Sequence, residues 1–140
     1  MSTTSEIAAF AKGFRGQVLR PGDRNYDDAR RVWNGMIDKR PALIVRAAAV
    51  TDVIQAVEFA RESGLVLAVR GGGHNVSGNA VCDGGLMLDL SLMRSVRVDP
   101  KRQSLRAEGG LVWRDLDHEA EAFGLATTGK LEIFNCLAHF

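Results

Sequence analysis

The sequence predicts an α+β fold that starts with a βαβ unit and continues with further strands and a helix. Two short apolar runs rich in branched side chains, residues 42–45 and 65–69, flank a segment with helical periodicity. The following part of the chain alternates strand-like runs with turn residues. With 140 residues, 46% of them hydrophobic and 25% charged, the chain has the length and composition of one globular unit with one core.

Residues 1–36 are predicted as a helical lead-in, and residues 37–140 as the domain proper. Apolar residues at helical spacing predict a short helix within residues 1–14. Pro21 and the residues after it indicate a turn, and a second helix is expected from Tyr26 to about Trp33.

The strongest helical pattern lies between the two apolar runs. Its apolar positions recur with a period near 3.6, Thr51 is the predicted N-cap, and Gly64 ends the pattern. Strand, helix and strand therefore predict a βαβ unit with a right-handed crossover and parallel strands.

The second half of the chain is predicted to be antiparallel. Residues 86–90, 95–99 and 104–108 are expected as strands, and a helix is expected from Leu111 until Gly124 ends it. The apolar face of this helix is predicted to consist of Trp113, Leu116, Ala120 and Phe123.

Charge and cysteine content exclude several classes of partner. The formal net charge is +1, from 18 Lys and Arg against 17 Asp and Glu, so no strong field attracts a polyanion. Neither a secretion signal nor a run long enough to span a membrane is present, and two cysteines are too few for a disulfide framework. We therefore expect a cytoplasmic protein with neither nucleic acid nor a membrane as a partner.

The residues with the most distinctive chemistry follow the second apolar run, where a parallel strand ends and ligands collect. Consecutive glycines lose much conformational entropy on folding, so they are typical of places where a ligand approaches the backbone or positive φ is required. Their amides suit a pyrophosphate, and polar side chains beside them add hydrogen bonds. The candidate cofactor-binding residues are Arg70, Gly71, Gly72, Gly73, His74, Asn75, Ser77 and Gly78.

The same residues have plainer interpretations, which stay open at this level. A glycine cluster is also typical of a tight, flexible turn, and this one matches neither GxGxxG nor GxxxxGK[ST]. Arg70 is suited to neutralise a phosphate or to pair with a carboxylate. A lone loop histidine such as His74 is more often a hydrogen-bonded structural residue than a functional one.

Several segments taken together resemble a known family. Residues 26–35, 40–42 and 69–75, followed by 86–100 and 113–129, are similar in order and spacing to FAD-linked oxidoreductases of the vanillyl-alcohol-oxidase type, in particular the berberine-bridge-enzyme-like branch. The resemblance implies that this flavoprotein chain is the N-terminal part of a PCMH-type FAD-binding domain. FAD is then the cofactor, and a small-molecule substrate transfers hydride to it.

The family resemblance also implies roles for the loop residues. In that family the amides of the glycine loop bind the FAD pyrophosphate, and the histidine that matches His74 is commonly bonded covalently to the 8-methyl carbon of the flavin. His74 is therefore the candidate for a covalent flavin link. The resemblance identifies no catalytic residue and no substrate.

The chain departs from the family pattern after Gly129, where a second glycine-rich segment is expected and Lys130 and different residues follow. We therefore expect an FAD-binding domain that is incomplete at its C-terminus, in a truncated or frame-shifted form, with weak FAD binding and no turnover. Two alternatives stay open: a non-enzymatic dinucleotide-binding module, and a half that a separate chain completes.

Three other positions are given plainer interpretations. Cys82 is expected to be a small buried residue without chemistry. His118 lies among acidic residues, a pattern more typical of a solvated helix face than of a metal site, and we predict no metal. Trp113 is interpreted as a core residue rather than one that stacks on the flavin.

Overall fold

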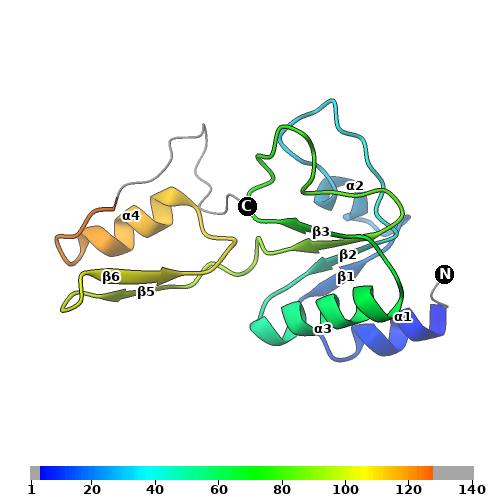
Figure 1. The fold of residues 1–140 in the computed structure, drawn as a ribbon, viewed down its shortest axis with the longest axis horizontal. Coiled ribbons are helices and arrows are strands. Elements are labelled where there is room, and N and C mark those ends of the chain that lie inside the picture. The colour runs from blue at the N-terminus through cyan, green and yellow to red at the C-terminus, as the bar shows by residue number, and fades with distance from the viewer. Residues whose placement is uncertain (1–3, 128–140) are drawn as a thin grey trace.

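A four-stranded sheet forms the centre of the larger of two lobes (Figure 1). The structure, a computed structural model, describes residues 4–127. The sheet has the order β1-β2-β4-β3; β1 is antiparallel to β2, whereas β2 and β3 both pair in parallel with β4. The strands are β1 (Gln17–Leu19), β2 (Leu43–Arg46), β3 (Leu67–Arg70) and β4 (Leu86–Asp89).

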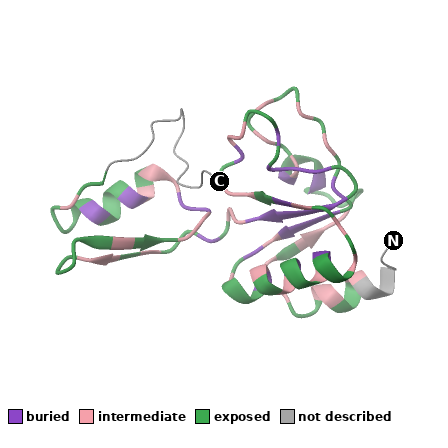
Figure 2. Ribbon diagram, in the orientation of Figure 1, coloured by how far each residue is buried: buried purple, intermediate pink, exposed green. Residues whose placement is uncertain are grey.

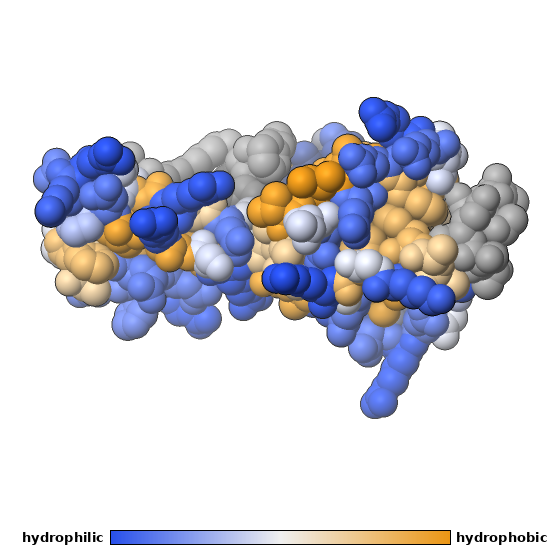
Figure 3. All heavy atoms as spheres, turned by 90° about the horizontal axis from the view of Figure 1, so that it is seen from below, coloured by the Kyte–Doolittle hydropathy of each residue, from blue (hydrophilic) through white to orange (hydrophobic). Residues whose placement is uncertain are grey.

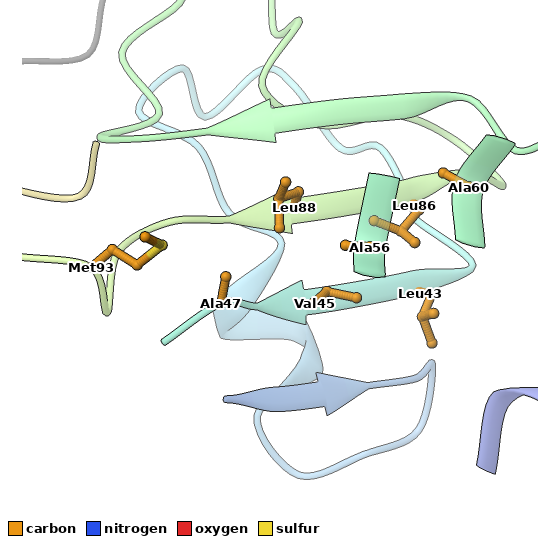
Figure 4. Close-up of a cluster of buried hydrophobic side chains, with 8 residues drawn as sticks. All are labelled: Leu43, Val45, Ala47, Ala56, Ala60, Leu86, Leu88 and Met93. Atoms are coloured by element: carbon orange, nitrogen blue, oxygen red, sulfur yellow. The ribbon is translucent and has the colours of Figure 1, made fainter. Parts of the chain in front are cut away.

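Helices cover both faces of this sheet. Alternate residues of a strand point to opposite faces, and both faces of β2 carry apolar side chains that must be buried. On one face, Leu43 and Val45 of β2 pack in one cluster with Ala56 and Ala60 of helix α3 (Val50–Glu62), as Figure 4 shows. Helix α1 (Thr4–Ala11) adds partly buried apolar residues to this cluster. On the other face, Ile44 joins a second cluster with the short helix α2 (Tyr26–Ala29).

The position of β4 corrects the predicted topology. The two strands of the βαβ unit are parallel, as predicted, but β4 lies between them, so they are not neighbours. The prediction that residues 86–90 belong to an antiparallel half of the chain is therefore wrong. All four residues of β4 are buried, as is usual for a central parallel strand covered on both faces.

The smaller lobe contains the antiparallel part of the fold. Strands β5 (Val96–Asp99) and β6 (Ser104–Ala107) form a hairpin, and helix α4 (Trp113–Glu121) packs against β5. Leu116 and Ala120 form the buried face of α4, whereas Phe123 is 51% exposed. Gly124 follows α4 with a φ of +65°, in agreement with its predicted role as the residue that ends the helix.

Three local predictions need correction. Helix α2 ends at Ala29 instead of about Trp33, because the N–H of Trp33 donates to the carbonyl of Gly73 (3.0 Å) rather than to the preceding turn. The N-cap of α3 is Ala49, not Thr51. Strand β1 was not predicted, and it lies within the residues that we predicted as a helical lead-in. The division at residue 36 stays a prediction.

Burial is concentrated in the central strands of the larger lobe, and the smaller lobe is buried only along one side of α4 and in the segment that joins the lobes (Figure 2). Apolar atoms also reach the surface on the side of α1 and α3 (Figure 3). Among the described residues, no helix is both long and apolar enough to cross a membrane.

Candidate functional site

The predicted cofactor loop begins where three parallel strands end together. Arg46 of β2, Asp89 of β4 and Arg70 of β3 are register partners at the carboxyl edge of the sheet. Residues 71–78 continue directly from β3. The loop therefore lies outside the carboxyl ends of parallel strands, which is where open sheets of this kind bind their ligands.

A buried ion pair holds this edge together. The carboxylate of Asp89 is fully buried; Arg70 donates to it from Nη2 (2.6 Å) and Nε (3.3 Å), and Arg46 donates from Nε (3.2 Å). The N–H and the hydroxyl of Ser91 donate to the same carboxylate (2.9 and 3.0 Å). Arg70 also donates from Nη1 to the carbonyl of Arg31 (2.8 Å). The predicted pairing of Arg70 with a carboxylate is therefore present in the structure. Contact of Arg70 with a phosphate of the cofactor stays a prediction.

The loop presents a run of backbone donors. Within residues 4–127, the N–H groups of Gly71, Gly72, Gly73 and His74 donate no hydrogen bond. Gly73 has a φ of +73°, a conformation that side chains disfavour. Successive backbone N–H groups in such a turn form a concave anion site. The residues present therefore fit a pyrophosphate group.

The remaining loop residues divide into two kinds. The Asn75 side chain accepts from the N–H of Asn79 (3.0 Å), and Gly78 approaches Ile37 so closely that an added Cβ would lie 2.8 Å from its side chain. These two residues shape the loop. The side chains of His74 and Ser77 make no hydrogen bond within the described part of the chain, so both are free to contact a ligand.

A second segment, which was not among the predicted site residues, lies against the loop. The Trp33 N–H donates to the carbonyl of Gly73, the Asn34 side chain to the carbonyl of Val76 (2.9 Å), and Lys39 to the carbonyl of Gly78 (2.9 Å). No local pattern indicates these contacts, because they join residues about forty positions apart. The family motif at residues 26–35 was the one signal in this region.

Cys82, His118 and Trp113, for which the sequence predicted no role in the site, are not placed in the loop by the structure. Burial raises the pKa of the Cys82 thiol, which disfavours the nucleophilic thiolate, and the side chain is buried as predicted. His118 is exposed on α4 in the smaller lobe, where Trp113 is partly exposed. No group of three or more His, Cys, Asp or Glu suited to a metal ion occurs among the described residues.

A comparison with protein-family models identifies the family of this chain. The family model described as "FAD binding domain" matches residues 41–136, which include β2, the glycine loop and the smaller lobe. The chain belongs to this FAD-binding domain family. Its cofactor is FAD, in agreement with the amide donors of the loop and with the resemblance found in the sequence.

Known relatives of this FAD-binding domain are FAD-linked oxidoreductases. The chain is 42% identical over 112 residues to (R)-6-hydroxynicotine oxidase of Paenarthrobacter nicotinovorans, covering 80% of the chain and 24% of that protein. It is 35% identical to an FAD-linked oxidoreductase of Dictyostelium discoideum, covering 87% of the chain and 27% of that protein. The chain thus spans about a quarter of the length of these relatives.

Solved structures agree with the fold. 6-Hydroxy-D-nicotine oxidase from Arthrobacter nicotinovorans matches with a TM-score of 0.76 at 40% identity, covering 80% of the chain and 25% of that structure. The BBE-like 1 protein of Physcomitrella patens matches with a TM-score of 0.74 over 81% of the chain and 26% of that structure; at 23% identity this likeness concerns the fold alone. The predicted α+β fold of a PCMH-type FAD-binding domain is confirmed.

Proposed function

We propose that this chain provides the pyrophosphate-binding part of the FAD site in an oxidoreductase that acts on a small organic molecule. The observation that supports this most directly is a run of N–H groups, at Gly71, Gly72, Gly73 and His74, that donate no hydrogen bond within residues 4–127 and lie at the carboxyl edge of three parallel strands. Bound FAD supplies the acceptor for a hydride removed from the substrate. The relative named for 6-hydroxynicotine makes that compound the first substrate to test.

Within this site, the chain's own residues hold and orient the nucleotide. The glycine amides donate to the phosphate oxygens, and the absence of side chains there allows the phosphates to approach the backbone. Ser77 adds a hydroxyl donor, since it is exposed in the same loop. Asn75 and Gly78 act indirectly, by maintaining the turn that presents these donors.

His74 is our candidate for the covalent link to the flavin. Its side chain is partly exposed and makes no hydrogen bond within residues 4–127, so neither ring nitrogen is engaged by a neighbouring group of that part of the chain. An imidazole nitrogen without such a partner is available as a nucleophile.

The test is acid precipitation of the 140-residue chain after incubation with FAD, with the visible absorbance of the pellet as the readout. We expect a yellow pellet from the wild type and a colourless pellet from His74→Ala. His118→Ala is the matched control, because His118 is exposed in the other lobe, and its pellet should stay yellow.

The same experiment separates a covalent flavin link from reversible binding of FAD. A non-enzymatic dinucleotide-binding module would bind FAD before precipitation and release all of it in acid. A yellow pellet from His74→Ala would place the covalent bond elsewhere. A wild type that fails to bind FAD before precipitation would contradict the proposed function itself. A cytoplasmic location stays a prediction.

A further inference from the structure

Residues 33–39, called the brace below, contact the glycine loop at three separate carbonyl groups. The Trp33 N–H donates to Gly73 (3.0 Å), the Asn34 Nδ2 to Val76 (2.9 Å) and the Lys39 Nζ to Gly78 (2.9 Å). The Lys39 ammonium also donates to the carbonyl of Val81 (3.3 Å). Every one of these polar contacts has its donor in the brace and its acceptor in the loop or just after it.

These contacts fix the direction of the loop's N–H groups as well. No cis peptide bond occurs among the described residues, and in a planar trans peptide the N–H points away from the preceding carbonyl. Because the carbonyl of Gly73 faces the brace, the N–H of His74 faces the opposite side. The carbonyl of Val76 orients the N–H of Ser77 in the same way. Neither N–H donates a hydrogen bond within residues 4–127.

The peptide unit between Gly78 and Asn79 has the same arrangement, and here the N–H is paired. The carbonyl of Gly78 accepts from Lys39, and the N–H of Asn79 on the opposite side donates to the Asn75 side chain (3.0 Å). The N–H groups of His74 and Ser77 have the same relation to the brace, but they have no such partner in the described part of the chain. The loop therefore has a carbonyl side that is bound by the brace and an opposite side, on which the N–H groups of His74 and Ser77 donate to no group within residues 4–127.

The brace itself is fixed in place by close contacts. The Asn34 Oδ1 accepts from the N–H of Met36 (3.1 Å), which directs the Nδ2 of the same amide toward the loop. Ile37 packs directly against Gly78, at a distance that leaves no room for a Cβ. The carbonyl side of the loop is thus matched to one arrangement of the brace.

We propose that the brace is a second part of the nucleotide site, in which Asn34 and Lys39 are positioning residues. By binding loop carbonyls they turn the N–H groups of His74 and Ser77 toward a pyrophosphate. This inference rests on the proposed function, since the ligand is the pyrophosphate of the same dinucleotide. Both residues act through the loop backbone and not by contact with the ligand.

The decisive variant is Asn34→Asp. Aspartate keeps an acceptor for the Met36 N–H but loses the donor to Val76 and places a carboxylate against that carbonyl. Asn79→Asp is the matched control, because it adds the same charge directly after the loop, and within residues 4–127 the only hydrogen bond of Asn79 is the one that its backbone N–H donates. The probe is ADP, which carries a pyrophosphate and no flavin, titrated into the full 140-residue chain.

We expect Asn34→Asp to raise the Kd for ADP roughly tenfold, since losing one hydrogen bond and leaving its acceptor unpaired has an effect of about this size. Asn79→Asp should change the Kd less than about twofold. Lys39→Met should weaken ADP binding as well, and Lys39→Arg should restore it, because a guanidinium also reaches carbonyl acceptors. Equal Kd values for Asn34→Asp and Asn79→Asp would overturn the inference.

A ligand-free measurement separates this inference from the proposed function. Backbone ¹⁵N relaxation of residues 73–78 should show increased mobility in Asn34→Asp and no change in Asn79→Asp, whether or not ADP binds. If the wild type fails to bind ADP, the proposed function is contradicted, and unchanged relaxation in Asn34→Asp would refute the brace independently.

Discussion

At the scale of single residues, two buried carboxylates organise the larger lobe. Asp89 joins the ends of three strands through Arg46 and Arg70. Asp52, in the first turn of α3, accepts from the N–H groups of Arg15 (3.0 Å), Gly16 (3.1 Å) and Ala48 (2.8 Å). A buried carboxylate is stable as an anion only when donors such as these surround it. Asp52 thus connects the start of β1 to the start of α3.

Asp52 makes stability depend on pH. Burial alone would raise its pKa, but the hydrogen bonds from Arg15, Ala48, Gly16 and Ala49 outweigh it and hold the pKa below the ordinary value of an aspartate. A group with a lowered folded-state pKa stabilises the fold above its unfolded pKa, and this stabilisation is lost as the pH falls through the folded value. The contribution of Asp52 should therefore be complete above about pH 5 and decline below about pH 4.

Urea denaturation of Asp52→Asn against the wild type measures this contribution. The variant should be less stable at neutral pH by about 1.5–3 kcal/mol, because charge-assisted hydrogen bonds are replaced by weaker ones. The difference should shrink as the pH falls below about 4. A difference that stays constant down to acid pH would contradict an ionised Asp52 in the fold.

At the scale of elements, the pairing of the edge strand β1 depends on a close approach between two backbone segments. β1 pairs with the end of β2, and Gly16 immediately precedes β1. A Cβ at position 16 would lie 1.8 Å from the carbonyl oxygen of Arg46, and no flexible side chain is available there to move aside. The antiparallel pairing of β1 therefore requires glycine at this position.

Gly16→Ala is expected to lower the free energy of unfolding by at least about 2–3 kcal/mol, because overpacking against backbone forces strands apart. Gly35→Ala is the matched control, since a Cβ there meets nothing within 4 Å. Chemical denaturation of the two variants tests this. Equal free energies of unfolding for the two variants would show that β1 can move aside without destabilising the fold.

At the scale of the whole molecule, the two lobes are unequally built. The larger lobe buries strands on both faces of its sheet, whereas β6 has no buried residue and α4 buries Leu116 and Ala120. Regions with few buried apolar contacts open locally at lower free energy. The smaller lobe is therefore the less stable part of the described chain.

Native-state hydrogen exchange tests this difference. We expect the amides of β2 and β4 to exchange at least about a hundredfold more slowly than those of β5 and β6, since about 3 kcal/mol separates such opening reactions. FAD should increase the protection of the glycine loop further. Equal protection of β4 and β6 would indicate one cooperative unit instead.

Local patterns in the sequence were sufficient for much of this protein. The period of α3, the apolar runs of β2 and β3 and the glycine after α4 each depend on neighbouring residues, so each was predicted close to its observed place. The glycine cluster after β3 was recognised as a loop for the same reason, its role in binding the cofactor stays a prediction, and the family was identified from several ordered motifs.

The tertiary structure alone decided the rest. The insertion of β4 between β2 and β3 follows from long-range pairing, and a continuous apolar run does not specify its neighbours in a sheet. The pairing of Arg70 with Asp89 and the contacts of Asn34 and Lys39 with the loop likewise join residues far apart in the chain. The sequence therefore determined which residues form the loop, and the fold determined which side of that loop presents its N–H groups, because peptide orientation depends on partners that only folding brings together.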